Sequence, residues 1–269
     1  MSTEEKVAAL RGADAPWEIA AGVFGLGPHG RTQTMVYLVR SSSSWVLVDA
    51  GWAGDAPRII AAAQALFGAD TPPAAILLTH AHPDHAGSAR ALAERWGSTV
   101  YVHPAELAIA SGDFTAMHEY AGPLDRWLVL PLLRAIGRRR REAMIARSSL
   151  AGIVRAFDPE AGVPGLPEWT CIHTPGHTPG HASFFRPADR VAITGDALLT
   201  LRVNTLPGIL LGSSGLSGPP RYTTWNWPLA KASIAAISRL EPTVIAGGHG
   251  TPLAGEASAV AMAAFARQV

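Results

Sequence analysis

The segment THAHPDHAG, residues 79–87, places three histidines and an aspartate within six positions. It follows Ala74–Thr79, an apolar run with the length of a buried strand, and overlaps the start of an alanine-rich helix expected over His85–Trp96. On an extended backbone, residues two apart point the same way. His80 and His82 can therefore present their imidazoles to one ion.

The proline after His82 predicts a turn that directs Asp84 and His85 toward a second, neighbouring position. Three imidazoles and a carboxylate suit Zn²⁺, and also Mn²⁺ or Fe²⁺. The alternative is a polar helix cap with incidental histidines, since Asp84 could cap the helix that follows. Three histidines in six residues are hard to explain as a cap, so the sequence favours two adjacent metal sites.

Two metal ions with an open water position need more than four ligands, so the remaining ligands should lie at other strand ends. The segment IHTPGHTPGH has a histidine at every fourth position, and ITGDAL and IAGGHG each end a predicted strand. The candidates are His173, His177, His181, Asp196 and His249. A lone histidine at a strand end is more often structural, but several such ends joining one cluster favour metal binding.

In these motifs the chain resembles the metallo-β-lactamase superfamily, in the large group that includes glyoxalase II-like hydrolases and lactonases. The similarity rests on LVDAGW, which ends a strand at Asp49, followed in order by THAHPDH, TPGHTPGH, TGD and GGHG. It implies an α/β fold, a four-layer αββα sandwich, with residues 1–269 in a single domain. Strand-like runs in two groups, each flanked by helix-like runs, also indicate two sheets between helical layers.

The resemblance also implies a role for each motif residue. It assigns His80, His82 and His177 to a first metal. It assigns Asp84, His85 and His249 to a second metal, and it makes Asp196 the bridge between the two. It leaves Asp49, His173 and His181 as supporting residues around these ligands.

Two divalent ions, zinc before manganese or iron, would lower the pKa of a shared water and supply hydroxide as the nucleophile. Asp84 would be the catalytic residue that orients it. Hydrolysis of a small ester-like acyl compound, an ester, thioester or lactone, is then the expected reaction. Cys171 lies in an apolar strand and is expected to be a core residue rather than a nucleophile.

Three other activities stay open. A mono-iron persulfide dioxygenase uses the same fold with only the first site occupied, which the complete set of second-site ligands disfavours. A metal-stabilised binding module without turnover would keep the same ligands. Hydrolysis of β-lactams is possible, although no feature of the sequence favours it.

A mostly helical insertion, residues 104–167, interrupts the series of strand-like and helix-like runs. Residues 124–133 (LDRWLVLPLL) are strongly apolar, and residues 134–147 (RAIGRRRREAMIAR) carry six arginines. The insertion is expected to be either a lid over an apolar acyl group or the interface of a homodimer. Together with the aromatic loop PPRYTTWNWP at 219–228, it supplies the candidate substrate contacts Trp127, Arg221, Tyr222 and Trp225.

The composition bears on partners and location. Lysine plus arginine number 22 and aspartate plus glutamate 21, so the net charge of +1 attracts neither nucleic acid nor an anionic membrane. No run reaches the roughly 20 apolar residues of a membrane-spanning helix. The segment Met1–Arg11 has no apolar core like that of a signal peptide, and Cys171 has no cysteine to pair with. We therefore expect a cytoplasmic protein.

Overall fold

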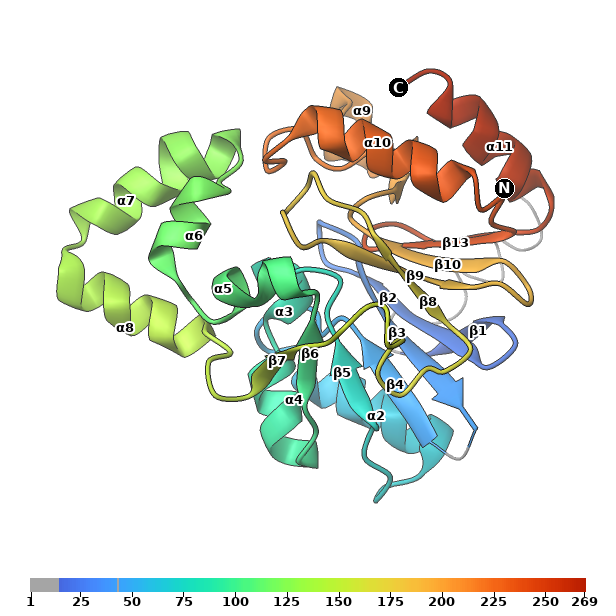
Figure 1. The fold of residues 1–269 in the computed structure, drawn as a ribbon, viewed down its shortest axis with the longest axis horizontal. Coiled ribbons are helices and arrows are strands. Elements are labelled where there is room, and N and C mark those ends of the chain that lie inside the picture. The colour runs from blue at the N-terminus through green and yellow to red at the C-terminus, as the bar shows by residue number, and fades with distance from the viewer. Residues whose placement is uncertain (1–14, 43) are drawn as a thin grey trace.

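The computed structural model describes residues 15–42 and 44–269. Two β-sheets lie face to face, with helices on the outer face of each, as Figure 1 shows. This arrangement confirms the predicted αββα sandwich. The segment Met1–Arg11, on which the expected cytoplasmic location partly rests, lies outside the described residues.

The first sheet has seven strands that pair in chain order. The first four strands pair antiparallel, and the fourth to the seventh pair parallel. Residues 17–26 form two strands rather than one, because the chain reverses at Gly22, where φ is +70°. The strands are β1 (Trp17–Ala20), β2 (Val23–His29), β3 (Thr34–Ser41), β4 (Ser44–Val48), β5 (Ala75–Leu77), β6 (Val100–Val102) and β7 (Val154–Ala156).

The second sheet has five strands, in the order β14, β13, β10, β9 and β8. They are β8 (Thr170–His173), β9 (Ala182–Arg186), β10 (Val191–Gly195), β13 (Val244–Gly247) and β14 (Leu253–Ala254). Strands β11 (Leu199–Leu201) and β12 (Ser214–Ser217) form a separate ribbon. Ahead of β12 lies helix α9 (Leu206–Leu211), which Thr205 caps by accepting from the backbone N–H of Gly208.

The outer layers are formed by α2 (Ala56–Phe67), α3 (Pro83–Ala86) and α4 (Ala89–Trp96) on the first sheet, and by α10 (Trp227–Ser238) and α11 (Ala257–Ala266) on the second. The predicted helix His85–Trp96 is divided into α3 and α4. A Cβ atom at Gly87, between them, would lie 2.3 Å from the backbone nitrogen of Ala53. Close packing of the two backbone segments thus coincides with the break.

The insertion contains helices over residues 104–148 and then a strand. Its helices are η1 (Pro104–Glu106), α5 (Leu107–Ala110), α6 (Phe114–Glu119), the π-helical η2 (Asp125–Val129), α7 (Leu130–Ala135) and α8 (Arg138–Ser148). Strand β7 then returns to the first sheet beside β6. Helices α6, α7 and α8 extend away from the sandwich at one side of the molecule (Figure 1).

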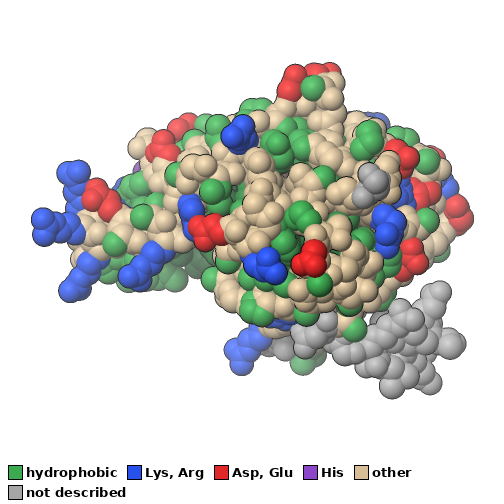
Figure 2. Space-filling view, turned by 90° about the horizontal axis from the view of Figure 1, so that it is seen from below, with side chains coloured by type: hydrophobic (Ala, Val, Ile, Leu, Met, Phe, Trp, Pro, Cys, Tyr) green, Lys and Arg blue, Asp and Glu red, His purple; other side chains and the backbone are tan. Residues whose placement is uncertain are grey.

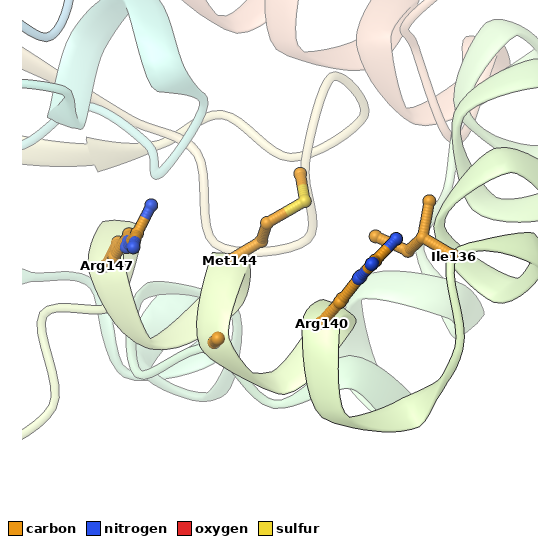
Figure 3. Close-up of a pocket in the computed structure, with 5 residues that line it drawn as sticks. Ile136, Arg140, Met144 and Arg147 are labelled. Atoms are coloured by element: carbon orange, nitrogen blue, oxygen red, sulfur yellow. The ribbon is translucent and has the colours of Figure 1, made fainter.

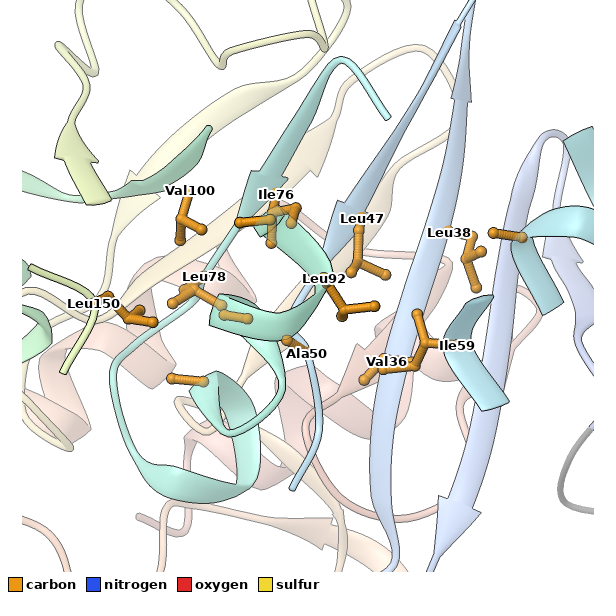
Figure 4. Close-up of a cluster of buried hydrophobic side chains, with 14 of the residues drawn as sticks. Val36, Leu38, Leu47, Ala50, Ile59, Ile76, Leu78, Leu92, Val100 and Leu150 are labelled. Carbon is orange, nitrogen blue, oxygen red and sulfur yellow. The ribbon is translucent and has the colours of Figure 1, made fainter. Parts of the chain in front are cut away.

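Alternating strand residues supply hydrophobic clusters that hold the strands in place. On the outer face of the first sheet, Leu47 and Ile76 pack with Ile59 of α2 and Leu92 of α4 (Figure 4). A second cluster fills the space between the sheets, and Cys171 packs against it, as expected of a core residue. No helix among the described residues is long and apolar enough to cross a membrane.

Candidate metal centre

The predicted ligands come from four separate segments of the chain that meet in space. The first segment follows β5 and runs into α3, the second is the turn between β8 and β9, and the others follow β10 and β13 directly. These segments bring together His80, His82, Asp84, His85, His177, Asp196 and His249. The sandwich thus gathers in one place the residues that the sequence places far apart.

Among the described residues, three groups of three side chains each have the spacing of a metal site. The group of His80, His85 and Asp196 links the other two, which share no residue. One, here called the His80 group, consists of His80, His82 and His177. The other, the Asp84 group, consists of Asp84, His85 and His249. Within each group the candidate donor atoms all lie within 4.8 Å of one another.

Asp196 lies between the two groups. Its Oδ2 is 3.4 Å from His177 Nε2 in the His80 group. Its Oδ1 is 3.2 Å from His85 Nε2 and 3.3 Å from His249 Nε2 in the Asp84 group. One carboxylate oxygen therefore faces each group, which is the geometry of a bridging ligand.

The residues of the centre fit a pair of cations. Three of its buried atoms, His80 Nε2, His85 Nε2 and Asp196 Oδ1, have no hydrogen-bond partner among the described residues. Such atoms are costly to bury unless something binds them. A Cβ atom at Gly248 would lie 2.3 Å from Asp196 Oδ1 and 2.6 Å from His85 Cε1, so the glycine keeps this space open.

Hydrogen bonds to acceptor atoms fix the orientation of two histidines in the Asp84 group. His85 Nδ1 donates to Asp49 Oδ2 at 2.8 Å, and His249 Nδ1 donates to the backbone carbonyl of Thr32 at 2.7 Å. With the proton on Nδ1, the Nε2 lone pair of each ring is directed at the centre, as a metal ligand requires.

Threonine hydroxyls do the same for two histidines of the His80 group. His80 Nδ1 lies 3.1 Å from Thr79 Oγ1, which donates its own proton to Asp49 and so accepts from the imidazole. His177 Nδ1 lies 3.4 Å from Thr224 Oγ1, which donates to a backbone carbonyl at 2.7 Å. Both rings therefore also present Nε2 to the centre.

The other two histidines of the TPGHTPGH region have different roles. His181 uses both ring nitrogens: Nε2 accepts from the backbone N–H of Asp196 at 2.9 Å, and Nδ1 lies 2.8 Å from Thr174 Oγ1. His181 thus holds Asp196 in place. His173 is exposed, stacks on His103 with ring centroids 4.0 Å apart, and donates to a backbone carbonyl of its own turn. It supports the turn rather than the ligands.

The electrostatic environments of the two groups differ. Burial, reinforced by neighbouring imidazoles, lowers the pKa of His80 and of His177 well below the usual value, so these rings are neutral donors. Burial also lowers the pKa of His85, but nearby carboxylates outweigh this and the net pKa is raised. Burial raises the pKa of Asp196, but His249 and His85 outweigh it and the pKa is well below its usual value.

The loop 219–228 joins the insertion to the centre. The backbone N–H of Trp225 donates to the carbonyl of His177 at 3.2 Å. The Trp225 ring packs edge to face on the Tyr120 ring, with the ring centroids 5.0 Å apart. The N–H of Leu124, at the start of the apolar part of the insertion, donates to the carbonyl of Tyr222 at 2.7 Å. The start of the insertion is thereby anchored next to the His80 group.

The proposed substrate contacts differ in position. Tyr222 is 44% exposed. Burial of the rest, together with the carboxylates of Asp196 and Asp84, raises its pKa, so the phenol senses the charge of the centre. Arg221 instead stacks on Trp227, with its guanidinium carbon 4.6 Å from the ring centroid. Trp127 is 80% exposed, so in this conformation it faces solvent.

Sequence reasoning missed three residues that support the ligands: Thr32, Glu106 and Thr224. Thr32 acts through its backbone carbonyl, which no side-chain pattern reveals. Thr224 sits in the aromatic loop, where the aromatic residues drew attention. Glu106 lies four residues after the end of strand β6, and an acidic residue near a strand end is the one signal that could have identified it.

A family model of the metallo-β-lactamase superfamily matches residues 29–249, which include every ligand candidate. The chain belongs to the metallo-β-lactamase superfamily. The superfamily is metal-dependent and hydrolytic, so the predicted family and enzyme class, a metallo-hydrolase, are confirmed.

Individual members of the superfamily agree with this. The chain is 34% identical over 244 residues to the probable metallo-hydrolase YflN of Bacillus subtilis (strain 168), covering 90% of this chain and 89% of that one. It is 29% identical over 147 residues to a hydroxyacylglutathione hydrolase of Chelativorans sp. (strain BNC1), covering 55% of this chain and 42% of that one. The crystal structure of TTHA1623 in a di-iron-bound form superposes with a TM-score of 0.56 at 27% identity, covering 86% of this chain and 94% of that one.

Proposed function

We propose that this metallo-β-lactamase superfamily member is a dinuclear hydrolase of ester-like acyl compounds, esters, thioesters or lactones, that carry an apolar group. The observation that supports the dinuclear centre best is Asp196, whose two oxygens face two separate groups of donors. One tetrahedral ion needs four ligands at most. The donor set here is larger than that, and it divides around Asp196 into two halves.

When bound, two divalent ions would supply an activated water molecule and polarise the scissile carbonyl. Asp84 is suited to act on that water, because its side chain is 17% exposed and is thus the most open of the Asp84 group. Its Oδ2 faces His249 Nε2 at 3.4 Å. The other oxygen is left to accept a hydrogen bond from the attacking water and to hold it in line with the carbonyl.

Tyr222 is suited to bind the substrate carbonyl. Burial, together with the carboxylates of Asp196 and Asp84, raises the pKa of its phenol, so the hydroxyl stays protonated near neutral pH and can donate a hydrogen bond. A donor aimed at the oxygen where negative charge develops stabilises the transition state. We assign this role to Tyr222 and leave Trp225 to hold the carbonyl of His177.

Zinc is the metal that we expect first, with Mn²⁺ or Fe²⁺ as alternatives. Neutral imidazole nitrogens dominate the His80 group, and they suit Zn²⁺ and Fe²⁺ alike. TTHA1623 holds two irons in its crystal structure. The donor types therefore support a divalent pair without choosing between these metals.

The insertion supports an apolar substrate group. Its exposed large side chains are Leu124, Trp127, Leu128, Val129, Leu132, Ile136 and Met144. An exposed apolar surface of this extent on a chain of this size indicates that something covers it. Because the insertion is anchored beside the His80 group, we propose that an acyl chain leaving the centre is covered by this surface.

A hollow on the insertion adds positive charge to that surface. It has a volume of about 300 Å³ and is lined by Ile136, Arg140, Ala143, Met144 and Arg147. Figure 3 shows Arg140, Met144 and Arg147 projecting from α8 toward one side. Figure 2 shows basic side chains gathered at this end of the molecule. These arginines would attract a carboxylate or phosphate on the substrate.

A substrate panel tests the proposal. Metal-loaded protein is assayed on p-nitrophenyl esters, acyl thioesters, lactones and a chromogenic β-lactam. We expect turnover of at least one ester-like class, with higher kcat/KM for longer acyl chains. Turnover of the β-lactam alone would contradict the proposed substrate class. Two bound ions with no turnover of any compound would favour a binding module. A dimer in sedimentation that dissociates when Trp127 is changed would favour the insertion as a dimer interface.

A further inference from the structure

Glu106 is a buried carboxylate that the proposed mechanism does not use. It ends η1 and is 0% exposed. Its Oε1 accepts from the backbone N–H of Ala81 at 2.9 Å. Its Oε2 accepts from Thr178 Oγ1 at 2.8 Å and from the backbone N–H of Gly180 at 2.9 Å. All three partners are donors, so the ionised carboxylate, which only accepts, is the form that fits.

The three donors belong to the two segments that supply the His80 group. Ala81 lies between His80 and His82, and Thr178 directly follows His177. Those segments are far apart in the chain, and each reaches Glu106 through hydrogen bonds shorter than 3 Å. Glu106 therefore connects the backbone on both sides of one half of the centre.

The contact is closely packed as well as hydrogen-bonded. A Cβ atom at Gly180 would lie 2.2 Å from the backbone nitrogen of Glu106 and 2.6 Å from its Cβ. The turn that carries His177 therefore lies directly on Glu106. Burying a carboxylate is unfavourable unless hydrogen bonds compensate, and here three do so.

The Asp84 group has a different buried carboxylate. Asp49 accepts from His85 Nδ1 and from the backbone N–H of Thr79, both at 2.8 Å. Within the part of the chain that the structure describes, the hydrogen bonds of Glu106 reach Ala81, Thr178 and Gly180 and none of the Asp84 group. Asp49 thus reaches both groups, directly at His85 and through Thr79 at His80, whereas Glu106 reaches only the segments of the His80 group.

We infer that Glu106 is a positioning residue for the His80 group: by joining Ala81 to Thr178 and Gly180, it sets the spacing of the three imidazoles of that group. This inference rests on the proposed dinuclear centre. It makes a selective prediction, because loss of Glu106 weakens metal binding at the His80 group and spares the Asp84 group.

The test is a Co²⁺ titration of the metal-free full chain, followed by visible absorption with a competing chelator. The variants His82→Ala and His249→Ala, which each remove one ligand from one group, supply a reference spectrum for each site. In Glu106→Gln the side chain keeps its size, but its NH₂ faces an N–H donor. Loss of such a supporting contact weakens metal binding by about 10- to 100-fold. We expect that loss at the His80 group and a change below about threefold at the Asp84 group.

Further variants control for the substitution and for folding. Glu94→Gln makes the same chemical change at an exposed glutamate and should leave both affinities as in the wild type. Thr178→Val removes one of the three donors while Glu106 stays, and it should weaken the His80 group alone by a few fold. Circular dichroism melting reports whether each variant folds. If Glu106→Gln does not fold, Thr178→Val decides.

The outcomes separate the two proposals. A wild-type chain that binds one Co²⁺ contradicts the dinuclear centre, and with it the inference. The wild-type chain can instead bind two Co²⁺. If Glu106→Gln or Thr178→Val then weakens both sites equally or neither site, only the role of Glu106 is contradicted. Asp49→Asn sharpens the comparison, because it should weaken the Asp84 group more than the His80 group.

Discussion

The metal centre and the helical insertion differ in how much of their structure is fixed before a ligand binds. In the centre, four of the histidine rings have a protein partner at Nδ1 and a donor nitrogen that faces inward. In the insertion, helix α8 has no buried residue, and Trp127 is 80% exposed. The centre is preorganised for chemistry, whereas the insertion has an apolar surface that still needs an occupant. Substitutions in the centre should therefore change catalysis itself, and substitutions in the insertion should change which substrate is used.

The largest effect is expected at Asp196. Asp196→Asn keeps the shape of the side chain but removes the charge that faces both donor groups, so metal content should fall and hydrolysis should drop by at least ~100-fold, the scale for loss of an electrostatic stabiliser. Metal analysis and kcat on the best substrate of the panel measure both effects. Unchanged activity in this variant would show that the carboxylate does not bridge two ions.

A smaller effect is expected at Tyr222. Tyr222→Phe removes the hydroxyl and leaves the ring, so kcat should fall about tenfold if the hydroxyl donates one hydrogen bond to the developing oxyanion. The metal content should stay at the wild-type value, which separates this variant from Asp196→Asn. A rise in KM with kcat unchanged would instead indicate that Tyr222 binds substrate and transition state equally.

The insertion should affect selectivity. Each buried methylene contributes roughly 0.8 kcal/mol, so each added acyl carbon should raise kcat/KM by about fourfold until the apolar surface is covered. Trp127→Ala should flatten this dependence and leave hydrolysis of a short ester nearly unchanged. The measurement is a homologous ester or lactone series on both proteins. A flat series in the wild type would rule out the lid and favour an interface.

The side chains that meet at the centre could be predicted from sequence, but the residues that support them could not. A metal site needs particular residue types at short spacings, and the run from His80 to His85 provides them in one turn of chain. Glu106 and Thr32 support these side chains through contacts with segments remote in sequence. An acidic residue after β6 is the one local signal for Glu106, and Thr32, which acts through its backbone carbonyl, has none. The division of Trp17–Leu26 into two strands and the return of β7 to the sheet likewise depend on pairing between distant segments.

The smallest effect is expected at Cys171. Burial raises the pKa of its thiol to about 11, so the thiol is protonated near neutral pH and is a weak nucleophile. Cys171→Ser should leave hydrolysis within about twofold of the wild type. Alkylation by iodoacetamide should be slow at pH 8 and accelerate as the pH approaches 11, because burial disfavours the thiolate. Loss of activity in this variant, with Asp196→Asn active, would indicate a cysteine nucleophile.

The central claim is that this superfamily member holds two metal ions in one centre. Plasma emission analysis of protein purified without chelator measures it directly, with oxygen uptake on a persulfide measured on the same sample. The two donor groups on either side of Asp196 predict two divalent ions per chain and no oxygen uptake. One iron per chain with persulfide-dependent oxygen uptake would contradict the account and identify a mono-iron dioxygenase instead.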